Sequence, residues 1–534
     1  MAPQAAFGGW LSVPPGFSTF LSPPMTYLLG YDIGSSSIKV ALLDADTGRC
    51  LASVTSPQQE MEISAPVAGW AEQQPERWWQ EVVNATRQLR HEYAFDAARV
   101  AGIGITYQMH GLVLVDHAGQ VLRPAIIWCD SRAVDLGNQA FHDLGETHCL
   151  QNYLNSPGNF TASKLKWVQE HEPDIYARVH KIQLPGDYIA FRLTGELQTT
   201  VSGLSEGVFW NFREQAVAQD LLDYYGISRE LLPAVVDTFA VQGRLAPAPA
   251  QELGLHAGTP IGYRAGDQPN NAFSLNVLQP GEIAATAGTS GVVYGISDAP
   301  TADPHSRVNA FVHVNSTPEQ PRNGVLMCMN GTGILNSWLR KVVGELPYDE
   351  MNQLAAQAPI GAAGLQFFPF GNGAERILEN QPTDAELRGL NFNIHDRRHV
   401  LRAAQEGIVF ALVYGLNIMR AAGVQVHTVR AGNANMFLSP VFREAFVNCG
   451  NVALELYNTD AAQGAARGAG VGVGLYASPA EAFGGLERLL TLAPTPDLQP
   501  QYQAAYARWQ QVLTTHILPQ PSSLPQRNVA QPAF

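Results

Sequence analysis

A single carboxylate, that of Asp267, stands among small and amide-bearing residues in the segment 263–271. Shortly after it, the apolar segment 281–287 runs into a turn of Gly, Thr and Ser at 288–291. Such a turn presents backbone N–H groups and hydroxyls that can hold phosphate without a dedicated helix. A carboxylate beside the turn would be an acid–base group next to a bound phosphate. Two Gly-rich surface loops without chemistry are the alternative.

A similar turn of small residues occurs near the start of the chain. The apolar segment 27–31 ends in Asp32, the turn 33–37 follows, and a second apolar segment covers 38–43. This pattern predicts a β-hairpin like the one at 284–294. Two such hairpins, one in each half, indicate a duplicated α/β unit that holds phosphates between its copies. An ordinary hairpin is the alternative.

A histidine follows the next apolar segment. The predicted strand 100–106 leads directly into Gln108-Met109-His110-Gly111. In open α/β sheets the carboxyl ends of strands carry ligands, so His110 could hydrogen-bond a substrate hydroxyl. The chain contains 14 histidines, and a purely structural role is the alternative.

Alternating strands and helices must position these groups. A strand at 259–263 is expected to deliver Asp267, and another at 428–431 to lead into the loop 432–435. The Gly-rich segment 464–472 lacks the G-x-G-x-x-G spacing and a preceding strand, so a close-packed helix of small residues is predicted there. Further helices are predicted at 75–89, 184–195, 221–225, 333–343, 400–419 and 501–513.

The length and composition are those of a globular protein. A chain of 534 residues exceeds the roughly 250–300 at which single cores stop growing, so two domains or more are expected. The net charge of -14 disfavours a nucleic-acid partner. The five cysteines form no C-x-x-C pair, which is typical of reduced thiols in a cytoplasmic protein. No apolar run is long enough to span a bilayer, so no membrane partner is expected.

Several motifs are missing from the sequence. It contains neither G-x-x-x-x-G-K-[ST] nor H-R-D, which disfavours P-loop and protein-kinase mechanisms. Residues 1–24 contain no charged residue and therefore lack the basic region of a secretory signal. We expect residues 1–24 to be a disordered extension outside the fold and residues 516–534 to be a tail.

Taken together, the motifs resemble those of the FGGY family of carbohydrate kinases, within the superfamily of actin-like and hexokinase-like ATPases. The resemblance covers about residues 25–513. It rests on the segments 32–39, 266–268, 287–291, 373–376 and 431–434 in this order. It implies an α/β, two-domain actin-like ATPase (ribonuclease H-like) fold, duplicated, with an interdomain cleft. The domains would be 25–275, for sugar and phosphate, and 276–515, for ATP.

Within this family, the segment 108–111 resembles the substrate segment of xylulokinases, and so do 70–73 and 123–128. The resemblance implies phosphorylation of D-xylulose to its 5-phosphate with ATP and Mg²⁺, and relatives are often homodimers. It makes Asp267 the general base and Asp32 the residue that orders Mg²⁺. The substrate would contact Met109, His110, Asp267 and Gln268. The nucleotide would contact Gly34, Ser35, Ser36, Gly288, Thr289, Ser290, Gly432 and Asn433.

Some positions depart from the commoner pattern of the family. Gln268 stands where many relatives have Asn, and Asn433 where a further Gly is usual. The segment 201–207 replaces an Asp/Ser-rich segment. These departures keep the phosphoryl chemistry but leave the sugar open. The alternatives are a kinase for gluconate, ribulose or L-xylulose and, from another class, a non-catalytic sugar or nucleotide sensor.

Overall fold

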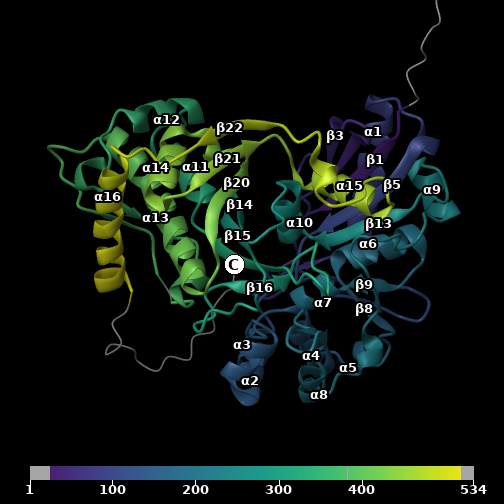
Figure 1. Ribbon diagram of the computed structural model, residues 1–534. Coiled ribbons are helices and arrows are strands. Elements are labelled where there is room, and N and C mark those ends of the chain that lie inside the picture. Colours follow the sequence, from purple (N-terminus) through teal and green to yellow (C-terminus); the bar gives the residue numbers. More distant parts are fainter. Residues whose placement is uncertain (1–24, 374, 382, 519–534) are drawn as a thin grey trace, which may run out of the picture.

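Two β-sheets, one built mainly from each half of the chain, organise the computed structural model of the protein (Figure 1). The structure describes residues 25–373, 375–381 and 383–518. The predicted extension 1–24 lies outside the described residues, as do residues 519–534 of the predicted tail.

The first sheet has five strands in the order β13-β5-β1-β2-β3. Strands β1 and β2 form the predicted antiparallel hairpin, and β3 continues it. Strands β5 and β13 lie parallel to β1 on its other side. The strands are β1 (Tyr27–Ile33), β2 (Ile38–Asp44), β3 (Cys50–Ser56), β5 (Val100–Tyr107) and β13 (Ile261–Gly266).

The second sheet has seven strands in the order β16-β17-β15-β14-β20-β21-β22. Here β14 and β15 form the second predicted hairpin, and β20 and β21 run parallel to β14. Both sheets therefore place two parallel strands on one side of a hairpin, which confirms the predicted duplication. The strands are β14 (Gly281–Ala287), β15 (Gly291–Ser297), β16 (Asn309–Val312), β17 (Asn323–Met329), β20 (Val426–Gly432), β21 (Ala453–Tyr457) and β22 (Arg488–Leu492).

Helices cover both sheets, and the helices predicted from the sequence are confirmed apart from small differences at their ends. The sequence patterns did not predict α2 to α5, which lie together at the lower end of the first half in Figure 1. The helices of the first half are α1 (Pro75–Glu92), α2 (Val134–Leu144), α3 (Glu146–Asn152), α4 (Thr161–His171), α5 (Pro173–Tyr176), α6 (Pro185–Thr194), α7 (Val201–Glu206), α8 (Gln219–Tyr225), α9 (Pro247–Leu253) and α10 (Asp267–Ser274).

In the second half, the long helix α13 is buried over most of its length and packs against α12, α14 and the sheet. Short strand pairs connect the larger elements. The helices are α11 (Gly333–Val342), α12 (Tyr348–Ala356), α13 (Arg397–Ala421), α14 (Pro440–Gly450), α15 (Ala461–Gly472) and α16 (Gln499–Val512). The short strands are β4 (Glu72–Gln73), β6 (Val113–Val115), β7 (Ala125–Ile126), β8 (Lys181–Gln183), β9 (Gln198–Thr200), β10 (Trp210–Asn211), β11 (Ala216–Val217), β12 (Ala234–Val236), β18 (Gln366–Phe368) and β19 (Glu386–Arg388).

Helix α15 comes late in the sequence but packs on strands β1, β5 and β13 of the first sheet (Figure 1). Its small residues allow a close approach: a Cβ at Gly30 would overlap the carbonyl oxygen of Ala462, and one at Gly104 that of Ala465. The predicted helix of small residues is confirmed. The expectation that no strand precedes it is wrong, because β21 ends at Tyr457.

The two halves also meet through hydrogen bonds between α7 and β16. Ser202 Oγ donates to the carbonyl of Val312 at 2.9 Å, and Ser205 Oγ accepts the N–H of the same residue at 2.9 Å. Within the described ranges, no helix is long and apolar enough to cross a membrane.

Candidate active site

Three parallel strands of the first sheet end at the same level, and the predicted chemical groups lie at or just beyond these ends. The register pairs Ile33 of β1 with Tyr107 of β5, and Tyr107 with Gly266 of β13. Asp32 and Asp267 therefore lie at one edge of the sheet, on either side of the segment that begins with Gln108. This carboxyl edge is where open α/β sheets bind ligands.

Asp267 is the first residue of α10 and is half-buried. Its carboxylate accepts hydrogen bonds from the backbone and the side chain of Gln268. Burial and then the negative charge of Asp32 raise the pKa of Asp267 to about 7. Burial and the charge of Asp460 raise the pKa of Asp32 to about 6, against the opposing effect of Lys39. Two neighbouring carboxyl groups thus titrate close to neutral pH.

A buried ion pair anchors the strand that delivers Asp267. Arg264 Nε of β13 lies 3.1 Å from Asp187 Oδ1 of α6, and both side chains are almost fully buried. Asp187 also accepts the backbone N–H of Leu184 at 3.2 Å. Breaking such a pair leaves an uncompensated buried charge, so the pair fixes β13 relative to α6.

His110 lies just beyond β5 in the left-handed region, with φ 61°. Its Nδ1 lies 2.9 Å from the carbonyl oxygen of Glu206. A carbonyl can only accept, so Nδ1 carries the hydrogen and Nε2 is left as an acceptor. Burial and then the charge of Lys164 lower the pKa of His110 to about 3, so the ring is neutral. A neutral ring in this tautomer accepts a hydrogen bond from a hydroxyl.

Aromatic rings from both halves pack against His110. The Phe160 ring lies 4.9 Å from it, edge to face, and the Phe311 ring of β16 lies 5.4 Å from it. Met109 is buried, and a Cβ at Gly266 would overlap its side chain. The side chain of Met109 therefore packs directly against Gly266, the residue that precedes Asp267.

The first predicted phosphate turn comprises Gly34, Ser35 and Ser36, between β1 and β2. Gln73 Nε2 donates to the carbonyl of Ser35 at 2.7 Å, and Trp128 Nε1 reaches Ser35 Oγ at 3.4 Å. Gln73 Oε1 in turn accepts Trp78 Nε1 at 3.0 Å. The side chains of Gln73 and Trp128, which were not predicted from the sequence to contact this turn, hold it at Ser35.

The second predicted phosphate turn comprises Gly288, Thr289 and Ser290, between β14 and β15. The carbonyls of Gly288 and Thr289 accept the N–H groups of Gly333 and Ile334, at 2.8 and 3.1 Å. These bonds join the turn to the start of α11. Thr289 is exposed.

Gly432 and Asn433 lie at the end of β20, beside the second turn. The register pairs Ala431 with Ala285 of β14, so both segments leave the sheet at the same edge. The N–H of Asn433 donates to the carbonyl of Tyr457 at 3.0 Å, and the side chain of Asn433 is exposed.

The structure thus places the predicted residues in two groups, one at each sheet edge. Burial and then the charge of Glu375 raise the pKa of Cys328 on β17, with a smaller contribution from Asp267, and Ser290 hydrogen-bonds the same thiol. Lys39 and Asp460 form an ion pair at 3.5 Å across the two halves. Both carboxylates of the first edge are therefore close to elements of the second half.

Sequence reasoning gave no individual role to Glu375, which is buried beside the second group. Its oxygens accept the N–H of Asn330 at 2.9 and 3.0 Å, and burial raises its pKa to about 7. The preceding residue, 374, lies outside the described residues. Glu375 belongs to the motif 373–376, which pointed to this segment in the sequence. The motif did not indicate that the Glu375 carboxylate would bind the N–H of Asn330.

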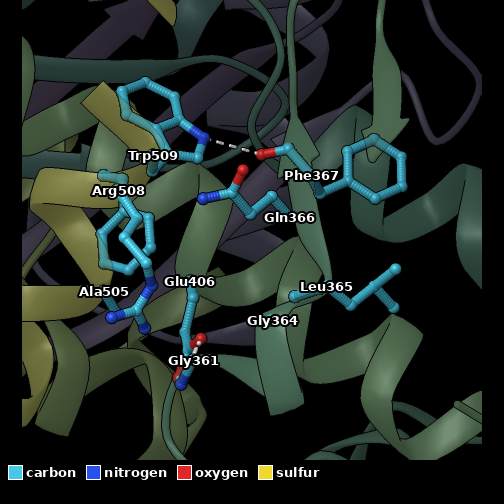
Figure 2. Close-up of a pocket in the computed structure, with 11 residues that line it drawn as sticks. Gly361, Gly364, Leu365, Gln366, Phe367, Glu406, Ala505, Arg508 and Trp509 are labelled. Carbon is cyan, nitrogen blue, oxygen red and sulfur yellow. Dashed lines mark hydrogen bonds between the residues drawn. The ribbon is translucent and has the colours of Figure 1, made fainter. Parts of the chain in front are cut away.

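A pocket between α13, α16 and β18 lies elsewhere (Figure 2). Its volume of about 10 Å³ leaves room for no more than one water molecule. Trp509 Nε1 donates to the carbonyl of Phe367 at 2.9 Å, and Glu406 accepts the N–H of Gly361 at 3.1 Å (Figure 2). No predicted site residue lines it.

Comparison with known proteins places the chain in a family. Residues 27–274 match the model for the N-terminal domain of the FGGY family of carbohydrate kinases. The xylulose kinase of Escherichia coli is 30% identical over 404 residues, which cover 75% of this chain and 80% of that protein. The chain belongs to the FGGY family of carbohydrate kinases. Kinases of this family use ATP, so this FGGY kinase does so too.

Two further proteins resemble this FGGY kinase over most of its length. An L-xylulose/3-keto-L-gulonate kinase of Escherichia coli is 29% identical over 505 residues, covering 91% of this chain and 96% of that protein. The crystal structure of a xyloylose kinase from Brucella ovis, 27% identical, covers 91% of this chain and 99% of that chain with a TM-score of 0.81. The two-domain actin-like ATPase fold expected from the sequence is confirmed.

Proposed function

We propose that this FGGY kinase phosphorylates D-xylulose to D-xylulose 5-phosphate, with Asp267 as general base. The observation that carries the proposal is the common level of the three strand ends, which puts Asp32, His110 and Asp267 at one sheet edge. The 30% identity to a xylulose kinase supports the choice of sugar.

In the proposed reaction, the C5 hydroxyl oxygen of the sugar attacks the γ-phosphorus of ATP. The new O–P bond forms as the bond to ADP breaks, and Asp267 takes the hydroxyl proton. A base is most effective when its pKa is close to the working pH, and Asp267 meets this condition. Its position at the start of α10 keeps the carboxylate fixed by its bonds to Gln268.

The carboxylates also fit a divalent cation. Burial raises the pKa of both carboxyl groups, and a neighbouring negative charge raises it further: that of Asp460 for Asp32, and that of Asp32 for Asp267. A cation would relieve this repulsion, and Mg²⁺ prefers one or two carboxylates together with phosphate oxygens. We assign Asp32 as the residue that orders Mg²⁺, which would neutralise charge on the phosphates. The two small-residue turns would bind the phosphates from opposite halves.

His110 accounts for sugar binding in this proposal. Its neutral ring offers Nε2 as an acceptor, which can take a hydrogen bond from a sugar hydroxyl. The carboxylate of a sugar acid has no hydrogen to donate and would not bind to Nε2. Gln268 would contact the sugar beside Asp267, and Met109 would support the segment from below.

A second candidate is phosphorylation of L-xylulose or 3-keto-L-gulonate. It is favoured by one observation: the relative with that activity in its name matches 91% of this chain, against 75% for the xylulose kinase. Both candidates use the same base and nucleotide site and differ only in the sugar.

A coupled ADP-release assay over a panel of sugars tests the proposal. D-xylulose, L-xylulose, 3-keto-L-gulonate, D-ribulose and gluconate are compared, with Asp267→Asn as the blank for contaminating kinases. We expect D-xylulose to give the highest kcat/KM. A clear preference for another sugar would reject the substrate but retain the reaction. Absence of sugar-stimulated ADP release with every sugar would favour a non-catalytic sensor.

A further inference from the structure

Three hydrogen bonds hold the backbone and ring of His110, and they come from two buried residues. Glu206 Oε1 accepts the backbone N–H at 3.3 Å, and the Glu206 carbonyl bonds Nδ1 at 2.9 Å. Lys164 Nζ donates to the His110 carbonyl at 2.9 Å. The left-handed backbone of His110 is unfavourable for a residue with a Cβ and persists only where its surroundings impose it.

Glu206, at the end of α7, is 1% exposed. Its Oε2 has no hydrogen-bond partner among the described residues and lies where a Cβ on Gly266 would overlap it. One carboxyl group therefore touches both the backbone of the sugar segment and the residue before Asp267. Burial raises the pKa of Glu206 well above its usual range.

Lys164, on α4, is fully buried and bonds two backbone carbonyls instead of a carboxylate. Besides that of His110, its Nζ donates to the carbonyl of Ile127 at 2.9 Å. Ile127 precedes Trp128, whose indole reaches the first phosphate turn. Hydrogen bonds from a charged donor are about twice as strong as neutral ones. Lys164 thus ties the sugar segment to the segment that contacts the phosphate turn.

We propose that Glu206 and Lys164 are positioning residues for the sugar. Together they fix the backbone of His110 in its left-handed conformation, so that the imidazole is held in place and accepts a sugar hydroxyl through Nε2. The proposal rests on the sugar-binding role of His110 proposed above. Glu206 also lies in the segment 201–207, where the sequence departs from the commoner family pattern.

The test compares sugar and ATP constants for matched variants, using the best sugar of the panel. Glu206→Leu and Lys164→Met remove the polar groups and keep most of the volume, whereas Glu206→Gln keeps a neutral acceptor. Glu81→Leu is the control, because Glu81 is equally buried on α1 and bonds Ser56 Oγ at 2.7 Å. We expect Glu206→Leu and Lys164→Met to raise the sugar KM roughly 10-fold or more, as expected for loss of a buried hydrogen bond. The KM for ATP should stay within about twofold in all variants, and the sugar KM should stay close to wild type in Glu206→Gln and Glu81→Leu.

A double-mutant cycle with His110→Ala decides whether the two residues act through His110. On that background, Glu206→Leu and Lys164→Met should change the sugar KM by less than about twofold, because the group that they position is gone. If instead each substitution raised the sugar KM on the His110→Ala background as much as in the wild type, or raised the KM for ATP equally, the positioning role would be overturned. The sugar-binding role of His110 would be unaffected by that result. A normal sugar KM in His110→Ala would overturn the sugar-binding role and the positioning role with it. If Glu206→Leu does not fold, the Lys164→Met cycle gives the same decision.

Discussion

Replacement of Asp267 by Asn should remove activity and, at the same time, stabilise the folded protein at alkaline pH. The carboxylate is half-buried, and burial together with the charge of Asp32 destabilises its ionised form. Asn keeps the shape and an acceptor for the bonds from Gln268 but carries no charge. The residue that we assign as base is therefore also a local source of instability.

The size of the effect follows from the pKa. The pKa of Asp267 rises from its ordinary value of 3.8 to about 7 on folding. At 1.36 kcal/mol for each pKa unit, the ionised group lowers stability by at most about 4 kcal/mol, and partial exposure to solvent reduces this to about 1–3 kcal/mol. Because the folded pKa is the higher one, the destabilisation is absent below about pH 4 and complete above about pH 7. Loss of the base should lower kcat about 10²–10⁴-fold.

Two measurements check this prediction. Steady-state ADP release gives kcat, and thermal unfolding of Asp267→Asn and wild type is followed at pH 5 and pH 8 without ligands. We expect a higher melting temperature for the variant at pH 8 and a smaller difference at pH 5. Asp237→Asn, at a residue outside the site, controls for the substitution itself. Near-native turnover would refute the assignment of the base, and an equal or lower melting temperature at pH 8 would refute the electrostatic reasoning.

Three further predictions concern the pH dependence, the ring of His110 and the packing of α15. The kcat/KM for the sugar should fall as the pH drops below about 7, and Asp32→Asn should move this fall to lower pH by removing a neighbouring charge; pH–rate profiles measure both. The ¹⁵N shifts of His110 should show hydrogen on Nδ1 at pH 7, and hydrogen on Nε2 would contradict the acceptor role. Gly104→Val should destabilise the fold by about 3 kcal/mol or more, since its side chain would overlap Ala465; denaturant unfolding with no change in midpoint would contradict this.

The two hairpins were predictable from the sequence because local patterns specify them. An apolar segment, a turn of small residues and a second apolar segment form a hairpin from short-range preferences alone. Asp32, next to the last residue of β1, and Asp267, directly after β13, lie at one edge of the sheet because parallel strands end there. That Asp32 and Asp267 act in one site was implied by the resemblance to the family and not by the strand patterns.

The support around His110 could not be predicted in this way. Glu206 and His110 are 96 positions apart, and neither the segment 201–207 nor α4 has a pattern that indicates its partner. The contact depends on how α7 packs on the first sheet, which only the tertiary structure defines. The docking of α15 on the first sheet was missed for the same reason, although Gly30 and Gly104 in the strands mark a close approach of backbone.

The position of α15 has a consequence for synthesis of the protein in the cell. Strands β1, β5 and β13 leave the ribosome in the first half of translation, but the helix that covers one of their faces is not complete until Gly472 has been made. Until then, the first half lacks the helix that packs on Leu28 and Tyr263, and this apolar face is only partly covered. Chaperones that bind nascent chains would therefore be expected to occupy this face, and to be released when α15 arrives.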